Sequence, residues 1–135
     1  MQSDRITEWE GNLKKVFDMI DDEVEDKFGR LYPLHPARPP RGMTASREQD
    51  GLFNIGASFS AGFGSTFGRG YVIDIDMVTL RSVPVTVKRQ VEETVVKRLR
   101  EELPKYFPGK NLQVQKDGEV FKIFGDLSFG RSKQI

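Results

Sequence analysis

Cysteine is absent from this sequence, and histidine and tryptophan each occur only once. Without cysteine the chain cannot form disulfides, zinc fingers, thiol nucleophiles or iron–sulfur clusters. Because His35 is the one imidazole, a metal site would consist mainly of carboxylate and carbonyl oxygens. Such oxygens suit magnesium, calcium or manganese better than zinc. These absences remove several classes of enzyme before any motif is considered.

Long apolar runs are absent as well. A membrane-spanning helix needs about 18 or more consecutive apolar residues, and the sequence has no such stretch. Residues 1–11 are polar, whereas a signal peptide has a cationic start followed by an apolar segment. We therefore expect a cytoplasmic protein with no membrane partner.

The composition indicates one globular domain. A chain of 135 residues with 37% hydrophobic and 30% charged residues can bury a modest core. We expect a single domain over residues 1–135, with residues 131–135 as a flexible tail. Residues 1–28 carry a net charge of −5 and residues 29–135 a net charge of +6. This asymmetry favours pairing within the chain or between copies, or binding of an anion by the basic part.

The first segment has the periodicity of an amphipathic helix. Apolar residues recur at helical spacing from Ile6 to Phe28, and Gly29 follows as a candidate C-cap. The spacing disfavours a calcium loop, which needs irregular backbone and a central glycine. The acidic residues of this segment are interpreted as a solvated face opposite the apolar stripe: Asp18, Asp22, Glu25 and Asp26.

The remaining segments outside the predicted strands are a second helix and a long connection. Pro84 suits the first position of a helix, apolar residues follow at four-residue steps, and the helix is expected to end near Pro104. Residues 31–51 contain four prolines and have no periodicity. We interpret them as a long Pro/Arg-rich connection, because proline removes backbone donors and favours extended backbone.

Two pairs of strands are predicted from alternation with period two. Residues 52–63 and 71–80 flank a glycine-rich stretch, which predicts an antiparallel hairpin. Residues 111–127 predict a second hairpin about Asp117–Gly118, a pair favoured in type I′ turns. The order is α-β-β-α-β-β. We predict an α+β two-layer sandwich in which two helices cover one face of a four-stranded antiparallel sheet.

The glycine-rich stretch SAGFGSTFGRGY does not match a nucleotide-binding motif. A Walker loop requires Gly-Lys-Ser/Thr before a helix, and a dinucleotide fingerprint also requires a helix. The spacing resembles the glycine-rich loop of protein kinases with one residue inserted, but the other kinase motifs are absent. Either the amides hold an anion, or the glycines only supply positive φ. The candidate ligand contacts are Gly62, Gly64, Ser65, Gly68 and Arg69.

Two further groups of residues are candidates for binding. His35, Arg38 and Arg41 in the Pro/Arg-rich connection could contact an anion or a partner's groove, or the connection could form a strap over its own sheet. Asp74 and Asp76 share one face of a strand and could hold magnesium or manganese. If that face points to solvent, they are ordinary surface carboxylates. We predict no other cofactor.

Three functional hypotheses follow. The first is a non-catalytic binding or assembly module, with a protein partner or a homo-oligomer, because Gly56, Ser58 and Ser60 allow close approach of a second surface. The second is a divalent-metal-dependent hydrolase or phosphoryl-transfer enzyme that uses the two aspartates. The third is a nucleic-acid module, which is disfavoured because the aspartates would repel phosphates. Its cations would be Arg69, Arg81, Lys88, Arg89, Lys97 and Arg98.

Overall fold

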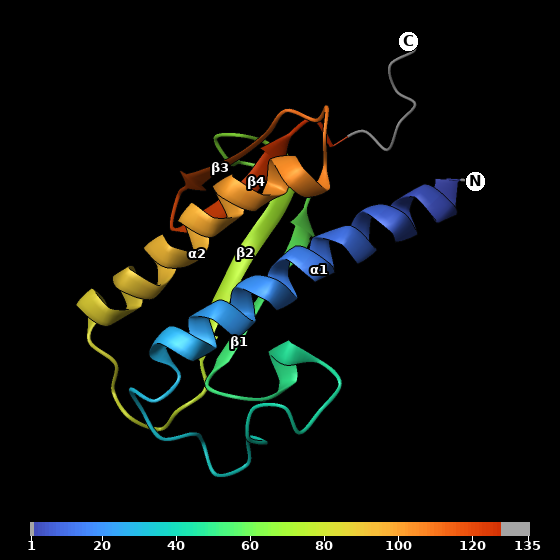
Figure 1. Cartoon of the computed structure of the whole chain (residues 1–135). Helices are drawn as coiled ribbons and strands as arrows, with labels where there is room; N and C mark the ends of the chain where they lie inside the picture. The colour runs from blue at the N-terminus through green and yellow to red at the C-terminus, as the bar shows by residue number, and fades with distance from the viewer. Residues whose placement is uncertain (1, 128–135) are drawn as a thin grey trace.

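The computed structural model describes residues 2–127 and has the predicted element order α-β-β-α-β-β (Figure 1). The predicted tail at residues 131–135 lies outside the described residues. A single turn of 3-10 helix, η1, precedes the first strand. The elements are α1 (Gln2–Phe28), η1 (Arg47–Gln49), β1 (Phe53–Ser60), β2 (Gly70–Met77), α2 (Val85–Tyr106), β3 (Leu112–Asp117) and β4 (Val120–Gly125).

The four strands form one antiparallel sheet in the order β1-β2-β4-β3, which confirms the predicted fold class. The β1–β2 hairpin is paired along its whole length, from Phe53 opposite Met77 to Ser60 opposite Gly70. β2 and β4 pair only at Tyr71–Ile123 and Val72–Lys122. Because the second hairpin attaches through β4, β1 and β3 are the two edges of the sheet.

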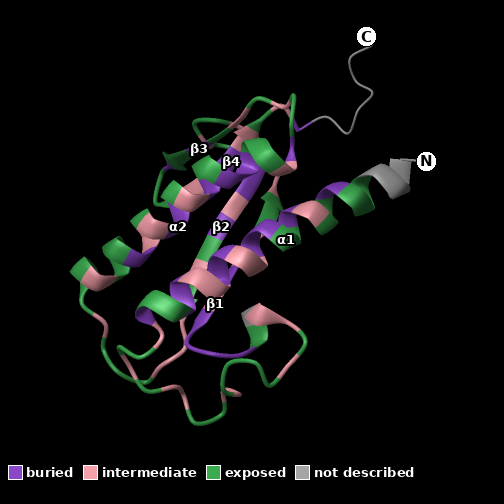
Figure 2. Cartoon of the chain, in the orientation of Figure 1, coloured by how far each residue is buried: buried purple, intermediate pink, exposed green. Residues whose placement is uncertain are grey.

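Both helices cover the same face of the sheet, and the buried side chains lie between the two layers (Figure 2). Trp9 of α1 joins the layers, since its ring lies 4.2 Å from that of Phe107 and 6.2 Å from that of Tyr71. Burying each large aliphatic side chain contributes about 1.5–3 kcal/mol, so these stripes account for the helix positions. The fully buried centre includes Val16, Ile20, Val24, Leu52, Phe53, Leu99, Leu103 and Ile123.

The ends of α2 differ from the prediction by a few residues. Pro84 is the N-cap, with φ −60° and ψ 148°, and the helix continues past Pro104 to Tyr106. A proline removes only its own hydrogen bond to the preceding turn. The turn that follows keeps a backbone hydrogen bond, which Phe107 N donates to Leu103 O at 2.9 Å. The buried side chains of Leu103 and Phe107 keep this last turn on the core.

The turn of the second hairpin is also displaced from the predicted Asp117–Gly118. Asp117 pairs with Val120, so the two central residues of the turn are Gly118 and Glu119. Gly118 has φ +70°, whereas no residue other than glycine in the described chain has a positive φ. A type I′ turn needs positive φ at both central positions, so this turn has the pattern of type II′ instead.

The Pro/Arg-rich connection is an ordered strap at the end of the β1–β2 hairpin. Its backbone is tied to the hairpin where His35 N donates to Val78 O at 2.9 Å. Asp50 is buried and accepts hydrogen bonds from the backbone of Gly42 and from Thr44 N and Oγ1, at 2.9–3.1 Å. Burial disfavours the Asp50 carboxylate, but these hydrogen bonds outweigh it and lower its pKa.

Neither of the two helices in the described part of the chain has an apolar stretch that could cross a membrane.

Candidate functional site

The glycine-rich loop, residues 61–69, folds onto the outer face of the sheet, away from the helices. Figure 1 shows it in green behind β3 and β4. The N–H groups of Thr66 and Phe67 donate to the two carboxylate oxygens of Asp117 at 3.0 and 2.9 Å. Lys122 lies 3.0 Å from the same carboxylate and donates to the loop at Ser65 Oγ, 3.0 Å away. The anion that these loop amides hold is therefore the protein's own Asp117.

The buried pair Asp117–Lys122 fixes the loop in place. The two residues are 7% and 2% exposed. Hydrogen bonds from Phe67 N and Thr66 N, together with Lys122, outweigh burial and lower the pKa of Asp117 to about 2. The Phe67 ring also stacks on the Phe124 ring, with centroids 4.3 Å apart. The loop thus forms a second small layer over the outer end of β3 and β4.

The glycines of this loop allow its backbone conformation. Gly62 has φ +80°, and a Cβ at this position would lie 2.0 Å from the carbonyl carbon of Gly68. Gly64 also has positive φ, but no atom lies within 4 Å of a Cβ built there. Ser65 Oγ donates to Gly62 O at 2.8 Å, whereas Arg69 is exposed. Positive φ and one close backbone approach account for the glycines, and contact with an external anion stays a prediction.

The three candidates in the strap use their polar groups within the protein. Arg38 donates to the carbonyl oxygens of Asp50, Gly51 and Phe53 at 2.9–3.0 Å. Arg41 forms ion pairs with Asp22 and Asp26 of α1. His35 Nδ1 accepts a hydrogen bond from Ala37 N at 3.0 Å. These contacts fit the interpretation of this connection as a strap.

Asp74 and Asp76 lie on the outer face of β2, where both are exposed. Asp74 accepts a hydrogen bond from Ser58 Oγ at 3.3 Å. Within residues 2–127, no three acidic, histidine or cysteine side chains gather as a metal site would require. Arg69 precedes the first residue of β2, whereas His35 binds Val78 beyond the last. An eight-residue strand spans about 25 Å, so the sequence candidates do not converge.

One of the cations proposed for nucleic-acid binding already forms ion pairs within the protein. Arg98 of α2 donates to both carboxylate oxygens of Glu23 on α1, at 2.6 and 3.0 Å. It also pairs with Glu101 and Glu102, and the hydrogen bonds that it donates to Glu23 and Glu101 raise the pKa of Arg98. This arginine joins the two helices to each other.

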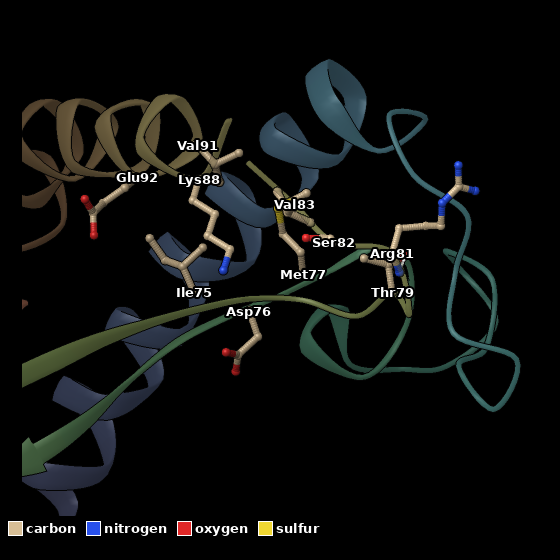
Figure 3. A pocket seen from close by; sticks show the side chains of 10 residues that line it. All are labelled: Ile75, Asp76, Met77, Thr79, Arg81, Ser82, Val83, Lys88, Val91 and Glu92. Atoms are coloured by element: carbon tan, nitrogen blue, oxygen red, sulfur yellow. Dashed lines mark hydrogen bonds between the residues drawn. The ribbon is translucent and has the colours of Figure 1, made fainter. Parts of the chain in front are cut away.

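A cavity of about 470 Å³ lies between β2 and the first half of α2 (Figure 3). Its charged side chains do not converge. Figure 3 shows Lys88 pointing into the space between α2 and β2, whereas Asp76 projects from the other side of the strand. Arg81 and Glu92 point away in different directions. The cavity therefore lacks the clustered groups that catalysis would need.

Two carboxylates of α1 bind the backbone of β1, and the prediction of Glu25 on a solvated face is wrong. Glu25 is buried, and its two oxygens accept from Leu52 N at 3.0 and 3.1 Å and from Phe53 N at 3.3 Å. Asp21, which is 2% exposed, accepts from Ile55 N. Burial, then the charges of Glu25 and Asp22, raise the pKa of Asp21 to about 8. One signal was available, because Asp21 follows Phe17 by four residues within the apolar stripe.

These contacts show which backbone groups of β1 face outward. Phe53 N is bound by Glu25 and Phe53 O by Arg38, so Phe53 points away from β2. In an antiparallel ladder every second residue points the same way, so Ile55, Ala57 and Phe59 also face outward. Ile55 N is held by Asp21. No described residue binds the N–H or C=O groups of Ala57 and Phe59, and we call residues 57–60 the open half of β1.

A recess with apolar and charged lining adjoins this open half. It has a volume of about 180 Å³ and lies between α1 and β1; Leu13, Phe17, Ile55 and Ala57 are its apolar lining, and Glu10, Lys14 and Asp18 line it as well. Two positions along the strand, Phe59 is 56% exposed, and its ring forms a T-shaped pair with that of Tyr71, with centroids 5.6 Å apart.

The other edge of the sheet is guarded. The guanidinium of Arg100 on α2 donates from Nε and Nη2 to Val114 O of β3, at 3.1 and 2.7 Å. β3 is also two residues shorter than β1 and includes Lys116 and Asp117. Charges and short length are the usual protections of an edge strand. β1 has neither protection, because it is eight residues long and has no charged residue.

The fold and this edge define a small two-layer α+β protein with one open sheet edge. The chain belongs to a family of uncharacterised proteins whose model matches residues 4–125, which includes every strand and both helices except the first residues of α1. It is similar to an uncharacterized protein of Borreliella burgdorferi, with 38% identity over 125 residues that cover 93% of this chain and 98% of the relative. No solved structure matches the chain.

Proposed function

We propose that this protein is a non-catalytic binding and assembly module that adds an extended polypeptide strand to the open half of β1. The observation that carries the proposal is the set of unpaired outward groups on Ala57 and Phe59, next to Phe53 of the same strand, whose outward N–H and C=O both have side-chain partners. An added strand would pair these groups, as in other cases of strand addition to a sheet edge.

The sequence of the strand supports this proposal. β1 reads FNIGASFS and contains no charged residue and no proline. Proteins usually protect an edge of this kind, because unpaired N–H and C=O groups are a template for another strand. Here α1 and the strap protect only the first half, through Glu25, Asp21 and Arg38. The recess beside Ala57 supplies a place for one apolar side chain of the incoming strand.

Amide hydrogen exchange in the presence of a model strand tests the proposal. The probe is a synthetic peptide with the sequence of residues 53–61. We expect the peptide to slow exchange at Ala57 and Phe59, whereas Ser58, which already faces β2, changes little. The substitution Ala57→Pro should abolish binding and preserve the fold, because the Ala57 N–H has no partner among the described residues. Unchanged exchange at both positions with saturating peptide would refute strand addition.

A further inference from the structure

We infer that the strand received by the open half of β1 is the same segment of a second copy of this chain, paired antiparallel about a twofold axis through Ser58. This inference rests on the proposed strand addition and names its partner. In this arrangement each Ser58 faces the other, and Ala57 of one copy lies opposite Phe59 of the other. The two four-stranded sheets become one continuous sheet.

The register follows from which groups are open. In an antiparallel ladder, a hydrogen-bonded pair of residues exchanges two N–H···O bonds. Pairing about Ser58 therefore satisfies the N–H and C=O groups of Ala57 and Phe59 in both copies. An axis through Ala57 would instead place Phe59 opposite Ile55, whose backbone lies against the buried Asp21 carboxyl. Of these two axes, the one through Ser58 uses open groups at every bond.

The side chains of the same two residues are self-complementary. Ala57 and Phe59 share the face of β1 that points toward the helices, because alternate residues of a strand share a face. The partner's Ala57 lies opposite Phe59 and forms part of the floor of the recess with Leu13 and Phe17. Each exposed Phe59 ring thus enters the recess of the other copy. One strand supplies both the projecting ring and the cavity, as an isologous interface requires.

The rest of the molecule allows this pairing and limits it to two copies. No charged side chain lies on β1, so the two strands meet without like-charge repulsion. On the opposite edge, β3, Arg100 already occupies Val114 O, and Lys116 and Asp117 add charge. Pairing about a twofold axis uses the open half of β1 in both copies, so assembly through this edge stops at two copies.

Charge substitution at Ser58 tests the axis directly. Ser58 is exposed on the outer face, and only a residue on the axis faces its own copy. Ser58→Lys and Ser58→Glu should each be monomeric by sedimentation velocity, and an equimolar mixture of the two should form a heterodimer. Asn54→Lys is the matched control, because it adds the same charge to the same strand and face without facing a second lysine. It should dimerise like the wild type.

A second substitution tests the recess. Phe59→Ala should raise the dissociation constant of the dimer about tenfold or more, as expected for a buried aromatic anchor. The monomer should keep its fold because the ring is 56% exposed. Leu80→Ala removes a side chain that is 73% exposed beyond the far end of the hairpin and should leave dimerisation unchanged.

The outcomes separate this inference from the proposed function. The inference of a second copy paired about Ser58 is wrong if the wild-type chain stays monomeric at the highest concentration measured. It is also wrong if the Ser58→Lys chain dimerises as well as the wild type. If that monomer still shows slowed exchange at Ala57 and Phe59 with the peptide of residues 53–61, strand addition stands and its partner is a different polypeptide. If the peptide also has no effect, both proposals are wrong.

Discussion

Replacing Asp21 by asparagine should stabilise the protein at neutral pH, which is unusual for a buried residue that accepts a hydrogen bond. Asp21 is 2% exposed, and one of its oxygens has no partner in the described structure. Burial, then the charges of Glu25 and Asp22, raise its pKa from 3.8 to about 8. The folded protein therefore retains a proton that the unfolded chain releases between these two pH values. Asparagine keeps the shape and the acceptor for Ile55 N without this requirement.

The magnitude follows from the same pKa. Each pKa unit corresponds to about 1.4 kcal/mol, so at pH 7 the ionisation of unfolded Asp21 costs the native state on the order of 4 kcal/mol. Because the native pKa is raised, this cost is absent below the unfolded value of 3.8 and grows as pH rises toward about 8. Asp21→Asn should match the wild type near pH 4 and exceed its stability increasingly above that.

Urea unfolding of both proteins at a series of pH values between these limits measures the difference. Asp18→Asn, one turn earlier, is the control: Asp18 pairs with Lys14 on the exposed side of α1, so its replacement should change the free energy of unfolding by less than about 0.5 kcal/mol. A variant at Asp21 that is less stable than the wild type at pH 7, or a difference that does not grow with pH, would refute the argument.

Two further predictions concern residues that the sequence singled out. Gly62→Ala should destabilise the protein by more than about 1 kcal/mol, because it adds a clash with Gly68 to the strain of positive φ. Gly64→Ala is the control, because it carries the strain alone. If chemical denaturation shows that both variants lose the same free energy of unfolding, the packing of the glycine-rich loop is contradicted. Millimolar magnesium or manganese should leave the melting temperature unchanged, because Asp74 and Asp76 are exposed and no third ligand gathers near them among the described residues. A rise in melting temperature that Asp74→Asn abolishes would support the metal-dependent enzyme instead.

The fold could be predicted because its signals are local. Helical spacing from Ile6 to Phe28 and the alternation on each side of the glycine-rich loop depend on neighbouring residues, and both were confirmed. The displaced turn at Gly118 has no such local signal, since Asp117 lies in the strand, where its carboxylate accepts from the distant Thr66 and Phe67.

The candidate site depends on contacts that spacing does not reveal. Glu25 reaches Leu52, 27 residues later, and Asp117 reaches Phe67 from 50 residues away. Glu25 was assigned to solvent because a helical wheel cannot show that the strap brings the start of β1 beside it. The sequence drew attention to the glycine-rich loop, but the structure places the unpaired backbone just before that loop, at Ala57 and Phe59.

Amide exchange at Ala57 and Phe59 across a dilution series tests the central claim most directly. If these two residues pair with a second copy, their amides exchange slowly in concentrated protein and quickly in dilute protein, while Ser58 exchanges slowly in both because it faces β2. A dimer whose Ala57 and Phe59 amides exchange at the same rate at every concentration would contradict the account, because its interface would then lie elsewhere on the molecule.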